Sequence, residues 1–151
     1  MSLAYTVYVA TSLSPEQVDR ALADDVTTST RAAKGAPTVR RQPAATVHPV
    51  SQAMFDDSYG FRPTVAATFD VPKWDDREWA ELGPLAEIAE LLRSAPGDAY
   101  VNYSGLVTAL LRRGDVITIN AEWLAGRPWL RRHLPDLFGP ACQVAHVPEP
   151  E

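Results

Sequence analysis

The clearest pattern in the chain is a change of hydrophobic period between residues 84 and 120. Apolar positions first recur at three- and four-residue steps, which places them on one side of an α-helix. These positions are Leu85, Ile88, Ala89 and Leu92. Pro84 suits a first helical position and Pro96-Gly97 suits a helix end, so we expect the helix to start at Pro84. The Gly83-Pro84 step leaves open whether one long helix is kinked there or two helices are separated.

After Gly97 the period falls from 3.6 to 2. Three runs rich in β-branched and aromatic residues cover positions 100–103, 106–112 and 116–119. The last two are joined by Gly114-Asp115, where glycine permits the positive φ of a tight hairpin turn. The pattern predicts a meander of three antiparallel strands, with its middle strand covered on both faces.

The first half of the chain carries two further strands and a helix. Residues 5–9 and 63–71 alternate apolar and polar positions, as half-buried strands do. Between them, Ser14 and Gln17 form a capping box, which predicts a helix from Pro15.

The segments between these elements have weaker patterns. Residues 24–42 indicate a loop or a weak edge strand, and residues 44–50 an edge strand bounded by prolines. Residues 52–60 indicate an exposed turn. The sequence does not show whether residues 24–57 are ordered. A second capping box at Asp75 and Glu78 predicts a helical turn that reaches Leu82.

Beyond residue 120 the sequence predicts short elements only. Asn120 is suited to cap a single turn at residues 121–125, and a short helix is expected from Pro128. An edge strand at residues 143–147 and a disordered tail at residues 148–151 complete the chain. The predicted fold class is α+β, with a mostly antiparallel sheet of five to six strands, two main helices packed on it and short C-terminal helices.

The composition narrows the functional classes. A length of 151 residues with 46% hydrophobic residues suits a single soluble domain, which we place at residues 1–147. No apolar run approaches the roughly 18 residues needed to cross a membrane, and a net charge of -5 argues against a nucleic-acid surface. The N-terminus lacks the features of a secretory signal, and the lone Cys142 suits a reducing compartment, so we expect a cytoplasmic location.

The sequence offers little catalytic chemistry. It contains no phosphate-binding glycine loop and none of the common metalloprotease or serine-hydrolase motifs. Its three histidines, at positions 48, 133 and 146, lie too far apart to suggest metal-ligand spacing. We therefore predict no catalytic residue, no cofactor and no metal.

Paired acidic residues and tryptophans suggest a protein-contact surface instead. Adjacent carboxylates are usually solvated loop or cap residues, and most tryptophans cover the rim of a core. The sharper hypothesis is that two acidic clusters form one surface that meets a basic protein, with one or two tryptophans beside it. The candidate contact residues are Asp56, Asp57, Tyr59, Asp75, Asp76, Glu78, Trp123 and Trp129.

Three segments occur together in a familiar order: SYGFRPTVAATFDV at 58–71, APGDAYVNYSG at 95–105 and VTALLRRGDVITIN at 107–120. Their order and spacing resemble the immunity proteins of swarming-inhibition (Sit) toxin cassettes, a bacterial family within polymorphic toxin systems. The opening segment at 3–18 resembles the family's first strand and helix. The resemblance implies a cytoplasmic protein that neutralises a cognate toxin by occlusion and is not an enzyme. An acidic inhibitor suits a basic toxin such as a nuclease, because opposite charges speed capture.

Two other functional classes stay open at the sequence level. One is a small-molecule-binding domain or enzyme with a pocket between sheet and helices, for which the polar lining would be Tyr100, Asn102, Tyr103 and Thr108. The other is an oligomerisation module that pairs through an exposed strand edge, for which residues 143–147 are the candidate.

Overall fold

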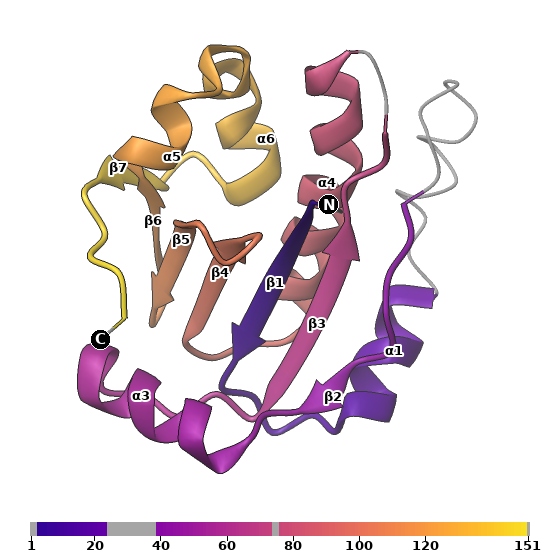
Figure 1. The fold of residues 1–151 in the computed structure, drawn as a ribbon, viewed down its shortest axis with the longest axis vertical. Helices are drawn as coiled ribbons and strands as arrows, with labels where there is room; N and C mark the ends of the chain where they lie inside the picture. The colour runs from indigo at the N-terminus through magenta and orange to yellow at the C-terminus, as the bar shows by residue number, and fades with distance from the viewer. Residues whose placement is uncertain (1–2, 24–38, 74–75, 151) are drawn as a thin grey trace.

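A computed structural model describes residues 3–23, 39–73 and 76–150 of the chain. Its seven strands form one sheet in the order β2-β3-β1-β4-β5-β6-β7 (Figure 1). The strands are β1 (Ala4–Val9), β2 (Ala45–Thr46), β3 (Val65–Asp70), β4 (Ala99–Tyr103), β5 (Val107–Arg113), β6 (Val116–Asn120) and β7 (Gln143–Ala145). The helices are α1 (Pro15–Ala23), α3 (Pro49–Tyr59), α4 (Arg77–Ser94), α5 (Ala121–Ala125), the 3₁₀ helix η1 (Pro128–His133) and α6 (Leu134–Phe138).

The predicted α+β class is confirmed, but the sheet is larger and less uniform than expected. Every described strand pair is antiparallel except β6 with β7, which is parallel. The parallel pair arises because α5, η1 and α6 carry the chain from the end of β6 back to the start of β7, and such a crossover needs a dozen or more residues. The predicted edge strand at residues 44–50 is reduced to the two residues of β2.

The main core lies on one face of the sheet, which we call the α4 face. Alternate residues of β1, namely Tyr5, Val7 and Val9, are at most 1% exposed and pack with side chains from α1 and α4. The predicted apolar face of α4 is confirmed, since all four of its residues are buried. Side chains from α5, η1 and α6 extend the same core across β5 and β6.

Helix α4 does not start at Pro84 as predicted; it begins at Arg77 and continues through the proline to Ser94. Its N-cap is Asp76, whose carboxylate accepts a hydrogen bond from the N–H of Glu78 at 3.0 Å. Pro84 removes one hydrogen bond of the helix, at a cost of about 3 kcal/mol. Gly83 and Pro84 are both buried, and tertiary packing of this part of the helix offsets the cost, so one helix forms instead of two.

The two clearest local predictions are confirmed. At the start of α1, the N–H of Ser14 donates to Gln17 Oε1 at 2.8 Å and the N–H of Gln17 donates to Ser14 Oγ at 3.2 Å, which completes the capping box. Strands β4, β5 and β6 form the meander, and Gly114 adopts a φ of 60° in the hairpin turn.

Helix α3 replaces the exposed turn predicted at residues 52–60. His48 caps the helix by accepting a hydrogen bond from the N–H of Val50, and Pro49 occupies its first position. Phe55 and Tyr59, one turn apart, pack with Phe61 and Tyr100 in a second apolar cluster. This cluster lies on the face of the sheet opposite the main core, which we call the α3 face.

The last described residues lie against the domain. Residues 148–151 were expected to form a disordered tail, yet Pro148 accepts a hydrogen bond from the Tyr59 hydroxyl. The Glu149 carboxylate accepts the N–H of Thr108 at 2.8 Å. In Figure 1 these residues end beside α3.

Candidate functional site

The first acidic cluster of the sequence analysis lies on α3. Asp56 and Asp57 are exposed on its outer side, and Asp56 Oδ2 forms an ion pair with Arg62 Nε at 3.2 Å. Asp57 forms no ion pair with any described residue. Tyr59 is only 8% exposed and belongs to the aromatic cluster, so it supports the helix instead of presenting a surface. Burial raises the pKa of the Tyr59 phenol, which keeps it protonated as a hydrogen-bond donor.

The second acidic cluster lies at the N-terminus of α4. The Asp76 carboxylate caps the helix. Glu78 forms an ion pair with Arg132 of η1, and its Oε1 lies 3.3 Å from His133 Nε2. The side chain of Arg132 is 66% exposed, and Arg131 beside it is also exposed, so the local charge is mixed. Asp75 lies outside the described residues.

The structure does not bring the two acidic clusters together. Helix α3 leads into the start of β3, whereas α4 follows the end of β3, so a whole strand separates them. Figure 1 shows α3 and the start of α4 at opposite ends of the molecule. A single acidic surface built from both clusters is therefore excluded by the topology.

The tryptophans differ in exposure. Trp123 is 2% exposed and lies in the main core, where no partner can reach it. Trp129 is half-buried and packs against the same core. Trp79 on α4 is 41% exposed, although the sequence analysis did not select it.

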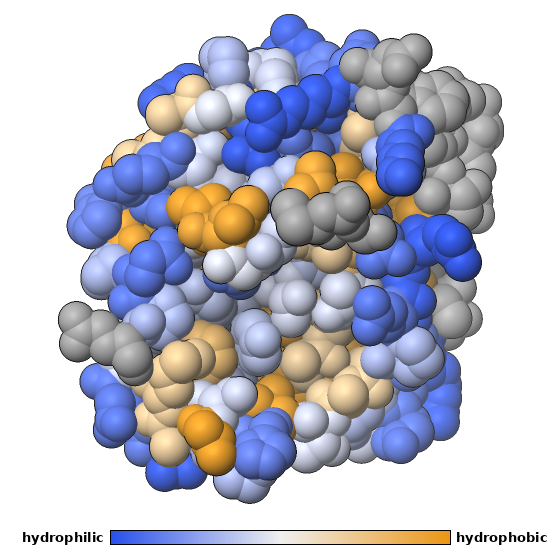
Figure 2. Space-filling model, viewed as in Figure 1, coloured by the Kyte–Doolittle hydropathy of each residue, from blue (hydrophilic) through white to orange (hydrophobic). Residues whose placement is uncertain are grey.

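The α3 face of the sheet carries a network of uncharged polar groups. Tyr100 Oη lies 2.8 Å from Thr108 Oγ1, and Asn102 Nδ2 donates to Tyr100 Oη at 3.2 Å. Burial raises the pKa of Tyr100 above its ordinary value. In Figure 2, which views the molecule from this side, pale side chains occupy much of the middle of the face and blue ones lie mainly at its rim.

The polar lining proposed for a small-molecule pocket is thus split between the two faces. Tyr100, Asn102 and Thr108 lie together on the α3 face, whereas Tyr103 packs in the main core. The Tyr103 ring lies under the guanidinium of Arg127, 4.6 Å from its Cζ. The four residues therefore do not line one pocket.

A buried charge network was missed by the sequence analysis. Arg127 Nε lies 2.8 Å from Glu81 Oε1, and both side chains are at most 4% exposed. The Tyr5 hydroxyl donates to the same Glu81 oxygen, and Arg77 Nε lies 2.7 Å from Glu81 Oε2. Burial raises the pKa of the Tyr5 phenol well above its ordinary value, and the Glu81 carboxylate adds to this effect.

A sequence signal for this network does exist. Glu81 lies four residues before Leu85 and seven before Ile88, so it continues the buried stripe of α4. A carboxylate at a core position needs a buried cation, since an unpaired buried charge is costly. The ion pair between Glu81 and Arg127 links α4 to the segment that follows α5.

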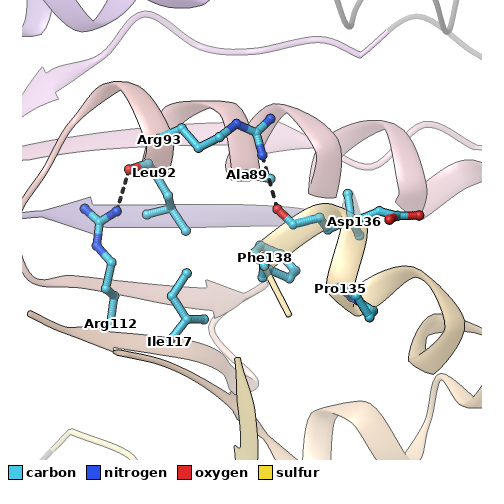
Figure 3. A pocket seen from close by; sticks show the side chains of 10 residues that line it. Ala89, Leu92, Arg93, Arg112, Ile117, Pro135, Asp136 and Phe138 are labelled. Atoms are coloured by element: carbon cyan, nitrogen blue, oxygen red, sulfur yellow. Dashed lines mark hydrogen bonds between the residues drawn. The ribbon is translucent and has the colours of Figure 1, made fainter. Parts of the chain in front are cut away.

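A small pocket of about 240 Å³ lies between α4, β5 and β6 and α6 (Figure 3). Small-molecule sites usually measure roughly 300–1,000 Å³, so this pocket is below their range. Arg112 at its wall is 7% exposed and donates to the carbonyl oxygens of Leu92, Ala95 and Gly97. Arg112 thereby caps the C-terminal end of α4, and burial lowers its pKa.

Within the described residues, no group of three or more His, Cys, Asp or Glu side chains is arranged to hold a metal ion. In the same part of the chain, no helix combines the length and the apolar character that a membrane span requires.

Comparison with known proteins adds one finding. A family model described as SitI3-like matches residues 3–128, which run from the residue before β1 to the first residue of η1. Searches of curated proteins and of solved structures found no match.

Proposed function

The chain belongs to the SitI3-like family, and on this basis we propose that it is an immunity protein that binds a cognate bacterial toxin and neutralises it by occlusion. The resemblance drawn from the sequence to Sit immunity proteins is confirmed at the level of the family. The observation that carries the proposal is the span of the match, which includes six of the seven strands of the sheet. In this proposal the protein acts by contact in the cytoplasm and performs no catalysis.

We place the toxin contact on the outer side of α3. Phe55 on the inner side of this helix is 1% exposed and packs with four other aromatic rings, so the helix is a fixed platform. Above it, Val50 is 72% exposed and Asp56 and Asp57 face outward. An apolar residue beside carboxylates offers both burial and charge to a partner.

The charge balance favours α3 over the start of α4. Asp56 and Asp57 are accompanied on the same segment by one arginine, Arg62. At the start of α4, Arg132 of η1 pairs with Glu78 and the neighbouring Arg131 is exposed, so this end of the molecule attracts a basic toxin less. Opposite charge on α3 would raise the rate of association with a basic toxin, and salt would reduce this effect.

Growth protection tests the proposed function. Cells that express the toxin encoded in the same gene cassette should survive only when this chain is co-expressed. Failure of the chain to protect against that toxin, despite soluble expression of both proteins, would refute the immunity function.

A charge reversal tests the proposed contact. Asp57→Lys should slow association with the toxin by about tenfold at low salt, because it places a cation on the steering surface. The matched control is Glu16→Lys, which reverses an exposed carboxylate on α1. Equal association rates for the two variants, measured by surface plasmon resonance, would place the contact elsewhere.

A further inference from the structure

The C-terminal strap, which we define as residues 146–150, crosses the α3 face of the sheet. After β7 it turns back toward α3, as the yellow end of the chain in Figure 1 shows. Val147 is 3% exposed, whereas His146, Pro148 and Glu149 are exposed on either side of it. One apolar side chain therefore anchors an otherwise accessible segment.

Four hydrogen bonds among the described residues hold the strap in place, and the first joins His146 Nδ1 and Glu122 Oε1. The N–H of Val147 donates to Asn120 Oδ1 at 3.0 Å, and the Tyr59 hydroxyl donates to the carbonyl of Pro148. The carboxylate of Glu149 accepts the backbone N–H of Thr108 at 2.8 Å. Each bond involves at least one side chain, so none of them is part of a β-ladder.

The strap fills an open stretch of strand edge. The pairing of β5 with β6 ends at Leu110 and Ile119, so Thr108 has no ladder partner on that side. Its carbonyl instead accepts from Asn120 Nδ2 at 2.7 Å, and its N–H binds Glu149. Without the strap, the Thr108 N–H is an unfilled donor at a strand edge, and an extended peptide can bind such a group.

We propose that the part of the α3 face that the strap covers, between Tyr59 and the Thr108 edge of β5, is a groove once the strap leaves, that this groove binds an extended segment of the toxin, and that the strap is its built-in occupant. The strap shows the chemistry that the groove accepts: an apolar side chain at the position of Val147 and a carboxylate two residues later. A toxin segment with this pattern displaces the strap and takes over its bonds to Tyr59, Thr108 and Asn120. The choice of a toxin segment as occupant rests on the proposed function.

The contacts that hold the strap allow a toxin segment to displace it. Asn120 Nδ2 donates to the Thr108 carbonyl at 2.7 Å, and Thr108 Oγ1 lies 2.8 Å from Tyr100 Oη, so the groups that receive the strap keep these other contacts when it leaves. The strap itself is held by one buried side chain and four hydrogen bonds, and such a segment opens at a lower free energy than the whole domain unfolds. It also lies outside the residues 3–128 matched by the family, so the built-in occupant belongs to this chain's own C-terminal part.

The first test needs no toxin. Val147→Ala weakens the strap in the full chain, and Val144→Ala is the matched control because Val144 lies on β7 and is 37% exposed. A synthetic peptide of residues 143–150 should bind the Val147→Ala variant on the order of tenfold more tightly than the wild type or the control, because the competent groove is more populated. Equal binding by all three proteins in calorimetry would overturn the proposal.

A variant that unfolds would not be informative, so thermal melting is measured first. If Val147→Ala is unfolded at the assay temperature, Glu149→Ala replaces it, since it removes the acceptor for Thr108 and leaves the buried anchor. The expected result for the peptide is the same.

The second test uses the toxin. Val147→Ala should bind it on the order of tenfold more tightly than the control, and the peptide of residues 143–150 should compete with it for the variant. Unchanged toxin affinity in the variant, with normal binding by the wild type, would overturn the groove proposal and leave the immunity function intact. Absence of toxin binding by all proteins would instead overturn the proposed function and the toxin as occupant.

Discussion

Two buried cations show how single residues set the packing of this protein. Arg127 is neutralised by Glu81, and its guanidinium lies over the rings of Tyr103 and Trp123. Arg112 binds three carbonyl oxygens at the end of α4 instead of a carboxylate. Each guanidinium holds one end of the same helix, so α4 is fixed at both ends by charged groups in the interior.

Removal of Arg127 should be strongly destabilising. Arg127→Leu leaves the Glu81 carboxylate buried with only Arg77 and Tyr5, and we expect a loss of about 3–5 kcal/mol in the free energy of unfolding. The double variant Glu81→Leu/Arg127→Leu should recover most of this loss. Urea denaturation measures the free energy of unfolding of the single and the double variant, with the exposed Arg131→Leu as control. A loss for Arg127→Leu no larger than that of the control would contradict its role in neutralising Glu81.

Glu122 should titrate below the ordinary range of a glutamate. Its hydrogen bond with His146 lowers the pKa of the Glu122 carboxyl. The resulting contribution to stability is present above the unfolded-state pKa and is lost as the pH falls through the folded-state pKa. NMR titration should show a lower Glu122 pKa in the wild type than in His146→Ala, because the variant loses the largest cause of the lowering. Equal values would exclude this contact in solution.

At the scale of elements, the local signals predicted some parts of the fold and missed others for identifiable reasons. Helix α1 and the β4–β6 meander were predicted because their capping and turn residues are adjacent to the elements in sequence. Helix α3 was missed because only Phe55 and Tyr59 face its core, amid polar residues that resemble a turn. The direction of β7 beside β6 depends on a crossover through three short helices, and the three residues of β7 carry no sequence signal for that direction.

The candidate site was predictable to a similar extent. The exposure of Asp56 and Asp57 followed from their adjacency in a polar segment, and it is observed. Their separation from Asp76 and Glu78 depends on the direction of β3, which the pattern of residues 63–71 does not encode. The burial of Trp123 likewise depends on the fold of α5 back onto the sheet.

Helix α3 should depend on its aromatic anchor. Phe55→Ala removes a ring in contact with Tyr8, Tyr59, Phe61 and Tyr100, and we expect a loss of about 3–5 kcal/mol in the free energy of unfolding. Val50→Ala on the outer side of the same helix should change it by less than about 0.5 kcal/mol. Similar losses in the two variants would contradict the packing of α3 on the sheet.

The connection between α4 and β4 should require glycine at position 97. Gly97 has a φ of 131°, and a Cβ there would lie 1.9 Å from the carbonyl oxygen of Ala10. We expect Gly97→Ala to cost more than about 2 kcal/mol, because both the backbone and the contact must shift. Gly105 has a φ of 70° and open space around it, so Gly105→Ala should cost about 1 kcal/mol. Equal losses for the two variants in thermal melts would contradict the close approach of Gly97 to Ala10.

At the scale of the whole molecule, one mixed sheet separates two different surfaces. The α4 face is filled by the main core, and the α3 face carries a polar network, an exposed acidic helix and the strap. Family membership supports toxin binding as the function, and the asymmetry of the sheet favours the α3 face as the contact surface. Both proposed contacts, the outer side of α3 and the groove beneath the strap, lie on this face.

The most direct measurement combines the purified chain with the purified toxin of the same cassette, follows complex formation by size-exclusion chromatography with light scattering, and assays the toxin in the recovered fractions. The proposed function predicts a stable complex of defined stoichiometry in which the toxin is inactive. Separate elution of the two proteins, with the toxin fully active in the presence of excess chain, would contradict it.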